Sequence, residues 1–439
     1  MTTRERKKNP SITLIGAGSQ VFGFSMCTDI CQTPALKGAD IRLVDVDARR
    51  LKIMEDLFTL ISRKTGMELK ISATTDRGAA LPGSDFVIVS VARDRINRWD
   101  KDLEISRRYG IVETQGECGG PGGLSLTLRN IPLLLEIAKD VERLAPDAVI
   151  LNFSNPMTRV CLAINRYTRV RCVGLCHGLI GVQHLLSKLL SREVLVKGCG
   201  INHFNWIFSA AWSDTGEDAW KAVEKTCATN DVPKYTRELF DVFGRIVTPD
   251  DGHITDFIHH WRGAAGGLNQ RYHLEPKNMD AYRESAAMWE QRIADYLSGK
   301  SDPLAGVSGL SGEGAIPIIT TMSGLTASYT EIAANLPNHG AIKNLPDDSV
   351  VEVPAQVSAG DIQGVKMGSL PEGIKSLIAR QLDIANLAVE AAVEGSYQKA
   401  LQALAIDPIV PDLQVAGNYL DDVLRAHRSV LPQFTLPGL

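Results

Sequence analysis

Two glycines follow the first apolar segment of the chain, where a nucleotide-binding turn would need them. The run SITLI at residues 11–15 leads into Gly16, Gly18 and Ser19. In such a turn the first glycine allows a sharp bend, the second lets a pyrophosphate approach the backbone, and the next helix supplies N–H groups. Asp45 closes the second apolar run, and its carboxylate could accept both ribose hydroxyls of NAD. These four residues are candidate cofactor ligands. The usual third glycine is absent, and a glycine turn of another α/β fold is the alternative.

A cysteine and two histidines follow later apolar runs. Cys176 and His177 come directly after residues 171–175, and His203 lies in the segment Gly-Ile-Asn-His. A thiolate and an imidazole can hold a divalent transition metal, and two protein ligands leave positions for substrate oxygens and water. A structural zinc site, in contrast, usually has four protein ligands. The pattern indicates an open metal site, with a buried thiol and a hydrogen-bonded core histidine as the alternative.

Three further segments carry polar side chains suited to binding or proton transfer. Asn155 precedes a proline after another apolar run, and its amide could hold ligand hydroxyls, although Asn-Pro is also common turn chemistry. Glu117 belongs to the glycine-rich stretch 116–123, which predicts a ligand-wrapping or surface loop before a helix capped by Ser125. Residues 249–257 cluster acids with a histidine, which are possible proton acceptors or simply an acidic turn.

The elements that must position these side chains predict a parallel sheet. Short strands are expected, alternating with helices, at residues 11–15, 41–44, 85–91, 148–151 and 171–175. Continuous apolar runs are typical of strands that are buried on both faces. The order favours an α/β fold with a doubly wound, Rossmann-type sheet similar to lactate and malate dehydrogenases. In such sheets ligands bind at the carboxyl ends of the strands, where the candidate residues are expected.

The second half of the chain is less regular. Residues 209–300 read as mostly helical, and residues 370–405 predict one long helix. We therefore expect two domains: an NAD-binding Rossmann-like domain at residues 1–198, and an α+β domain for substrate binding or oligomerisation at residues 199–439.

Composition excludes several other classes of protein. The 439 residues are 44% hydrophobic and 22% charged, as in globular proteins, with a net charge of −4. That charge favours neither nucleic acid nor an anionic membrane as a partner. Eight cysteines without a CxxC pair fit a reduced protein, and the charged N-terminus lacks the apolar core of a signal peptide. With no apolar run of about 20 residues, a cytoplasmic location is expected.

Taken together, the ordered motifs resemble glycoside hydrolase family 4, whose members depend on NAD and a divalent metal. The motifs are Gly-Ala-Gly-Ser, a Gly-Pro-Gly-Gly segment, an Asn-Pro turn, Cys-His-Gly and Gly-x-Asn-His, and the resemblance is best over residues 11–210. It implies oxidation of the sugar at C3 by NAD, removal of the C2 proton, elimination of the C1–oxygen bond and addition of water. A divalent metal such as Mn²⁺ would stabilise the enediolate.

The resemblance also implies roles for particular residues. Cys176 and His203 match the metal ligands of the family, and Asn155 matches an asparagine on the substrate side of the metal. Glu117 stands where the family often has aspartate, near the sugar. His177 is the candidate acid for the leaving group.

The base that would remove the C2 proton departs from the family pattern. Several relatives use a tyrosine, which residues 250–257 lack, so His253 and Asp256 are the candidates and Asp251 is third. Arg93 and Arg95 are candidate partners for a C6 carboxylate.

The Cys-His-Gly motif favours a sugar without a 6-phosphate and, within the family, an α-uronide such as a glucuronide or galacturonide. An α-glucosidase or α-galactosidase of the same family is the alternative, followed by a lactate- or malate-type dehydrogenase. An NAD-sensing regulatory protein is a further alternative, without a basic DNA-binding segment to support it. The resemblance also suggests a homodimer or homotetramer acting on a small glycoside.

Overall fold

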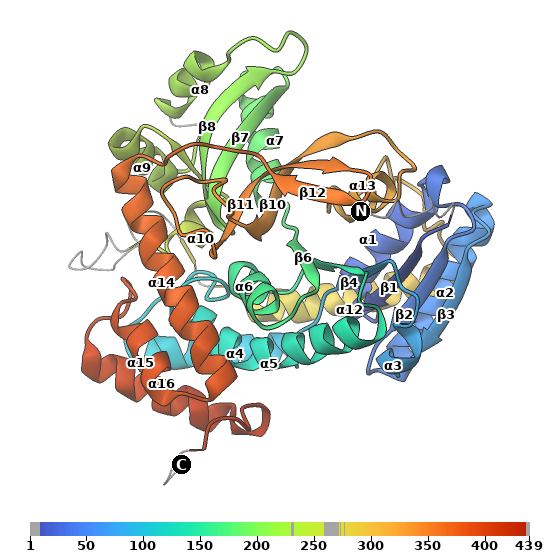
Figure 1. The fold of residues 1–439 in the computed structure, drawn as a ribbon, viewed down its shortest axis with the longest axis horizontal. Coiled ribbons are helices and arrows are strands. Elements are labelled where there is room, and N and C mark those ends of the chain that lie inside the picture. Colours follow the sequence, from blue (N-terminus) through green and yellow to red (C-terminus); the bar gives the residue numbers. More distant parts are fainter. Residues whose placement is uncertain (1–8, 230–231, 259–271, 273, 276, 436–439) are drawn as a thin grey trace.

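A mixed sheet runs through the whole molecule (Figure 1). The computed structural model describes residues 9–229, 232–258, 272, 274–275 and 277–435. The strands are β1 (Ser11–Ile15), β2 (Asp40–Val44), β3 (Lys70–Thr74), β4 (Phe86–Val89), β5 (Val149–Asn152), β6 (Arg171–Gly174), β7 (Val194–Ile201), β8 (Phe204–Trp212), β9 (Ile246–Thr248), β10 (Tyr329–Pro337), β11 (Val350–Ser358) and β12 (Asp361–Gly364). The helices are α1 (Gln20–Cys31), α2 (Ala48–Thr65), α3 (Arg77–Ala80), α4 (Arg95–Arg108), α5 (Gly120–Leu144), α6 (Met157–Tyr167), α7 (Gly178–Leu190), α8 (Trp220–Cys227), α9 (Lys234–Phe243), α10 (Asp251–Ile254), α12 (Met279–Leu297), α13 (Ala315–Met322), α14 (Glu372–Glu394), α15 (Tyr397–Ala405) and α16 (Leu413–Ala426).

The first six strands form the predicted parallel sheet. Their order is β3-β2-β1-β4-β5-β6, with every neighbouring pair parallel. This is the strand order of a doubly wound dinucleotide-binding fold, so the predicted fold class is confirmed. The five expected strands correspond to β1, β2, β4, β5 and β6, and β3 is an additional edge strand.

The sheet continues beyond β6 through antiparallel strands. Its order goes on as β10-β11-β7-β8-β9, with β12 paired to β11. Single residue pairs join the pieces: Asn335 with Gly174 between β10 and β6, and Glu352 with Gly200 between β11 and β7. The division expected between residues 198 and 199 falls inside β7, and two domains stay a prediction. Residues 209–300, expected to be mostly helical, also contain the end of β8 and all of β9.

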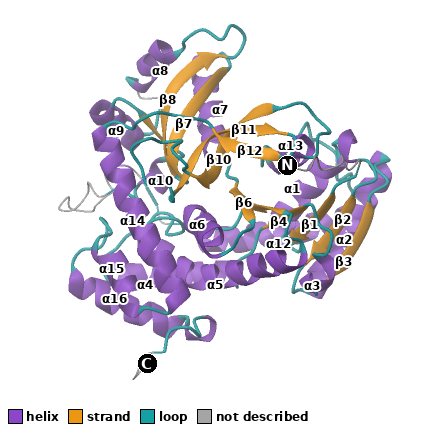
Figure 2. Ribbon diagram, viewed as in Figure 1, coloured by secondary structure: helices purple, strands orange, loops and turns teal. Residues whose placement is uncertain are grey.

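Helices cover both faces of the parallel strands (Figure 2). One buried cluster joins residues of β1, β4 and β5 to α5, α6, α14, α15 and α16. A second joins the alternate residues of the same strands to α1, α2, α12 and α13. Burial on both faces explains why these strands read as continuous apolar runs.

Two expected helix boundaries are wrong. Helix α5 begins at Gly120, so Ser125 lies inside it and is buried instead of capping it. The glycines are needed there because a side chain on Gly122 would collide with the backbone of Gly116. The single helix expected over residues 370–405 is two helices, α14 and α15, and the second begins after a Ser396 cap.

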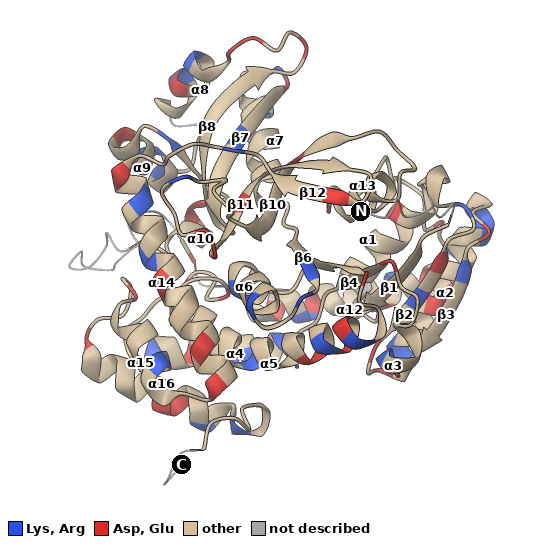
Figure 3. Ribbon diagram, viewed as in Figure 1, with Lys and Arg blue, Asp and Glu red and all other residues tan. Residues whose placement is uncertain are grey.

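Charged side chains of both signs are interspersed along the helices (Figure 3). No helix within the described part of the chain combines the length and apolar character that crossing a membrane requires. The first eight residues, on which the expectation about a signal peptide partly rested, lie outside the described residues.

Candidate active site

The glycine turn joins β1 to α1 at the carboxyl edge of the sheet. Gly16 has φ +90°, and a side chain there would collide with the carbonyl oxygen of Ser90 on the neighbouring strand. Ser19 is the N-terminal cap residue of α1. Asp45, at the end of β2, accepts a hydrogen bond from the Gly18 N–H at 2.8 Å. The structure therefore places Asp45 against the turn that carries Gly16, Gly18 and Ser19, so the four predicted cofactor residues lie together.

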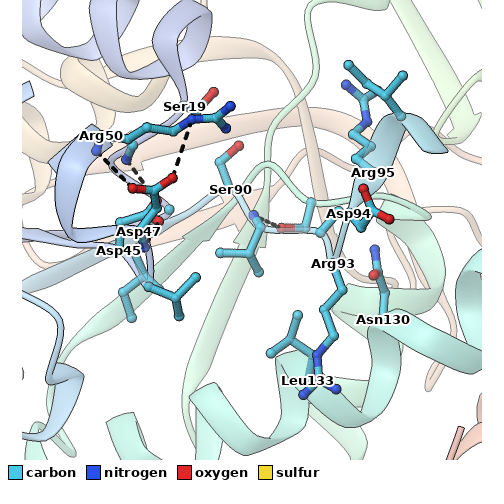
Figure 4. A pocket seen from close by; sticks show the side chains of 18 of the residues that line it. Ser19, Asp45, Asp47, Arg50, Ser90, Arg93, Asp94, Arg95, Asn130 and Leu133 are labelled. Carbon is cyan, nitrogen blue, oxygen red and sulfur yellow. Dashed lines mark hydrogen bonds and ion pairs between the residues drawn. The ribbon is translucent and has the colours of Figure 1, made fainter. Parts of the chain in front are cut away.

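A cavity of about 1220 Å³ opens beside this turn. Figure 4 shows Ser19, Asp45 and Arg50 on one side of it and Arg93 and Arg95 on the other. The lining also includes residues from other parts of the chain: Phe153, Ser154, Asn155, Glu117, Asn130 and Arg283. A cavity of this size, lined by the glycine turn at one end and polar side chains at the other, can hold an extended ligand.

The predicted metal ligands, Cys176 and His203, lie side by side. Cys176 follows β6, and His203 occupies the two-residue turn between β7 and β8. Their Sγ and Nε2 atoms are 3.4 Å apart. His203 has φ +61°, a left-handed conformation that costs a non-glycine residue about 1 kcal/mol or more and that is often found at functional sites. The turn thus holds an imidazole against a thiol.

Burial and nearby charges shift the pKa values of both side chains. Burial, together with the charge of Glu352, raises the pKa of Cys176 to about 11. Burial lowers the pKa of His203, but Cys118, Glu117 and Glu352 outweigh it and raise the value to about 9. Among the described residues, no group of three or more His, Cys, Asp and Glu side chains is placed to hold a metal ion. The protein donors at this point are therefore the Cys–His pair.

Glu117 and Asn155 line the cavity close to that pair. Arg95 Nη2 lies 2.7 Å from Glu117 Oε1. Burial raises the pKa of Glu117, but Arg95, His203 and a hydrogen bond from Asn155 outweigh it, so the net shift is downward. Asn130 on α5 fixes Asn155, because its Nδ2 donates to the Asn155 carbonyl oxygen at 2.6 Å.

His177 lies at the start of α7 and is exposed. Its side chain is 68% exposed, and its Nδ1 lies 3.4 Å from Glu313 Oε2. Glu313 raises the pKa of His177, so the imidazolium persists to higher pH than in an unpaired histidine. An imidazolium that neighbours Cys176 in sequence is a suitable proton donor.

His253 stands against His203 on the other side. The two rings meet edge to face with centroids 4.5 Å apart. Asp250 caps the short helix α10, and its Oδ2 lies 2.8 Å from His253 Nδ1. Burial lowers the pKa of His253, although Asp250 opposes the shift. A neutral imidazole oriented by a carboxylate is a common form of general base.

Asp256 and Asp251 bind backbone groups instead. Asp256 is 2% exposed, and it accepts hydrogen bonds from the N–H groups of Thr114 and Gly116 at 3.3 and 2.7 Å. Asp251 accepts from the N–H groups of Tyr235 and Thr236, both at 2.8 Å. Asp256 therefore holds the segment that carries Glu117, and Asp251 holds the start of α9.

The buried Asp256 makes a testable contribution to stability. Burial raises its pKa to about 7, well above its value in an unfolded chain. The folded state thus keeps this proton where the unfolded state loses it, and the free energy of unfolding falls as pH rises from about 4 to about 7. The variant Asp256→Asn lacks this titrating group, so its stability should not show this fall. The difference between the unfolding midpoint of the variant and that of the wild type should therefore increase from pH 5 to pH 8.

The exposed Asp348 is a matched control for that measurement. Its side chain is 81% exposed, so Asp348→Asn should follow the wild type across the same pH range. A midpoint difference for Asp256→Asn that stays constant with pH would contradict a protonated Asp256 in the folded protein.

Some contacts of the site were not predicted from the sequence. Asp250 is one of the possible proton acceptors of residues 249–257, but its pairing with His253 was not predicted, although its position three residues before His253 as a helix cap could have indicated it. Asn130 sits inside α5, where the sequence carries no signal for its bond to Asn155. Contacts of this kind depend on packing between distant segments.

Comparison with known proteins places the chain in a family. Residues 11–192 match the model of the family 4 glycosyl hydrolases, and residues 198–410 match that of the family 4 glycosyl hydrolase C-terminal domain. The chain is 32% identical to an alpha-glucosidase of Erwinia rhapontici, over 91% of this chain and 93% of that protein. It is 26% identical to an alpha-galacturonidase of Lachnoclostridium phytofermentans, over 96% and 97% of the two chains.

A solved structure shares the whole fold. It is a 6-phospho-alpha-glucosidase from gut microorganisms in complex with NAD and Mn²⁺, with a TM-score of 0.83 and 21% identity, over 98% of this chain and 100% of that one. The protein thus has an α/β fold of Rossmann-type architecture with an antiparallel extension. Because both family models match and together cover most of the chain, it belongs to glycoside hydrolase family 4. The alternative of a lactate- or malate-type dehydrogenase does not hold.

Proposed function

We propose that the protein cleaves an α-glycosidic bond of a small, non-phosphorylated sugar with the help of NAD and a divalent metal such as Mn²⁺. The Cys176–His203 pair beside the glycine-turn cavity carries this proposal. The solved 6-phospho-alpha-glucosidase with NAD and Mn²⁺ supports the choice of cofactors.

The residues of the cavity fit a dinucleotide. At Gly16 there is no room for a side chain, which leaves the backbone open to a close ligand at the start of α1. Asp45 now bonds the Gly18 N–H and could instead accept ribose hydroxyls.

The donor set fits a divalent transition metal. A thiol and an imidazole 3.4 Å apart can converge on one ion, and such ions bind both ligand types. Glu117 and Asn155 would hold sugar oxygens on the cavity side.

This arrangement suggests what each side chain of the site does in the reaction. When bound, NAD supplies reversible oxidation at sugar C3, and the metal supplies Lewis-acid stabilisation of the C2 and C3 oxygens. His253 takes the proton from C2, and Asp250 orients it. His177, paired with Glu313, gives a proton to the departing C1 oxygen. Asp256 positions residues 114–116 without touching the sugar.

The sugar we favour is an α-uronide, either glucuronide or galacturonide. Arg95 lines the cavity next to Glu117 and offers a cation for a C6 carboxylate. The relative that is named an α-galacturonidase acts, according to that name, on such a sugar. An α-glucoside is the second candidate, because the α-glucosidase relative is 32% identical.

A substrate panel tests the proposal. Purified protein with Mn²⁺, a thiol and NAD⁺ well below substrate concentration is given p-nitrophenyl α-glucuronide, α-galacturonide, α-glucoside and α-galactoside. We expect release of p-nitrophenol in excess of the NAD⁺ supplied, without accumulation of NADH, and fastest with a uronide. Stoichiometric NADH formation would contradict the proposed reaction, and faster turnover of the α-glucoside would favour the second candidate.

A further inference from the structure

Strand β11 carries a buried carboxylate in an apolar run. Glu352 is 3% exposed. Its Oε2 accepts hydrogen bonds from Asn202 Nδ2 at 2.9 Å and Asn335 Nδ2 at 3.0 Å, and its Oε1 accepts from Asn205 Nδ2 at 3.1 Å. A buried charge destabilises a fold unless something balances it, so this carboxylate requires an explanation.

Backbone carbonyls fix the orientation of two of these amides. Asn205 Nδ2 also donates to the Glu352 carbonyl oxygen at 3.1 Å, and Asn335 Nδ2 donates to the Gly174 carbonyl oxygen at 3.4 Å. N–H groups therefore point at both carboxylate oxygens.

Asn202 links Glu352 to the proposed metal site. It precedes His203 in the two-residue turn between β7 and β8, and its Nδ2 donates to Glu352 Oε2 at 2.9 Å. The charge of Glu352 also acts electrostatically on both Cys176 and His203. The buried carboxylate thus holds the residue next to the proposed metal ligand His203.

A second buried carboxylate shows what is different about Glu352. Asp102 is paired with the cationic Arg129, whose Nη2 lies at 2.6 Å, and it also contacts His427 Nε2 at 2.7 Å. The side-chain hydrogen bonds that Glu352 accepts within the described chain come from neutral amides. The positively charged group that Glu352 acts on is His203, whose pKa it helps to raise.

We propose that Glu352 is a positioning residue for the metal. It anchors Asn202 and, through it, the turn that holds His203 against Cys176, where the divalent cation would bind. This inference rests on the proposed metal site. It explains why an acidic residue occupies the centre of a buried strand.

The substitution Glu352→Gln separates this role from a structural one. Removal of a group that orients a metal ligand typically weakens metal binding about 10–100-fold. We expect a loss of that size for Mn²⁺, measured from the EPR signal of free Mn²⁺ during titration of the metal-free protein under reducing conditions. In EDTA the variant should keep the circular dichroism spectrum of the wild type, which would show that weaker Mn²⁺ binding is not a loss of fold. Added Mn²⁺ should then raise the unfolding midpoint less than in the wild type.

Glu331→Gln is the matched control. Glu331 is also buried, on the neighbouring strand β10, and its carboxylate is bonded by the Tyr329 hydroxyl and the Ile332 N–H. Its variant should bind Mn²⁺ like the wild type. If Glu352→Gln is not recovered folded, Asn202→Ser breaks the same link from the other end and should weaken binding about 10-fold.

Two outcomes would overturn the inference in distinguishable ways. Wild-type protein that binds no Mn²⁺ would remove the proposed metal site and this inference with it. The second outcome is that the wild type binds Mn²⁺ through Cys176 but Glu352→Gln binds it with an affinity within about twofold of the wild type. That result would leave the metal site standing and assign Glu352 a purely structural role.

Discussion

Cys176→Ser is expected to lower kcat/KM by about 10³-fold or more, because loss of the Lewis acid removes several kcal/mol of transition-state stabilisation. The thiolate is the form that binds metal, and a serine hydroxyl does not ionise to replace it. The variant should keep its circular dichroism spectrum and lose Mn²⁺ binding in the same EPR titration. Activity would be measured with the best p-nitrophenyl glycoside of the panel.

Cys227→Ser provides the control for a buried cysteine outside the site. Cys227 lies on α8, in a hydrophobic cluster away from the strand ends that carry the site. Its replacement should leave Mn²⁺ binding unchanged and alter activity only slightly. Full activity of Cys176→Ser would disprove the metal assignment.

His253→Asn should lower kcat by about 10²–10⁴-fold, the usual contribution of a general base. The asparagine cannot take the C2 proton, although its side-chain amide can still donate a hydrogen bond to Asp250 in place of the imidazole Nδ1. When the reaction runs in D₂O, the wild-type product should carry deuterium at C2. In single-turnover mixtures the variant should lose this exchange, as followed by NMR.

Asp250→Asn and His184→Asn complete that experiment. Asp250→Asn removes the group that orients His253 and should reduce the rate about 10-fold or more. His184 is an exposed histidine of α7, and its variant should behave like the wild type. Undiminished C2 exchange in His253→Asn would exclude it as the base.

The part of the fold that could be predicted from the sequence is the part governed by local pattern. Strand β4 (FVIV) is buried on both faces, so it reads as an unbroken apolar run, and the equally buried β1 (SITLI) is rich in β-branched and aliphatic residues. Strand β3, with the sequence KISAT, is an edge strand with no buried residue, and it gave no such signal. The glycine turn was visible because backbone geometry selects glycine there.

Long-range contacts account for what could not be predicted. The start of α5 contains three glycines, which disfavour helix, but Glu113 accepts a hydrogen bond from the Gly122 N–H at 2.9 Å and secures it. The partners of Glu352 come from positions 150, 147 and 17 residues away in sequence. A glutamate inside the run VVEV was the one local sign of that network.

The two single residue pairs that join the sheet have a mechanical consequence. Residues 174 and 335, and 200 and 352, are the narrow joints between three smaller sheets. Cys176 extends from the first of these sheets and His203 from the third. An ion held by both would therefore tie the parallel strands to the β7–β8–β9 strands across both joints, so that bound metal would resist their separation.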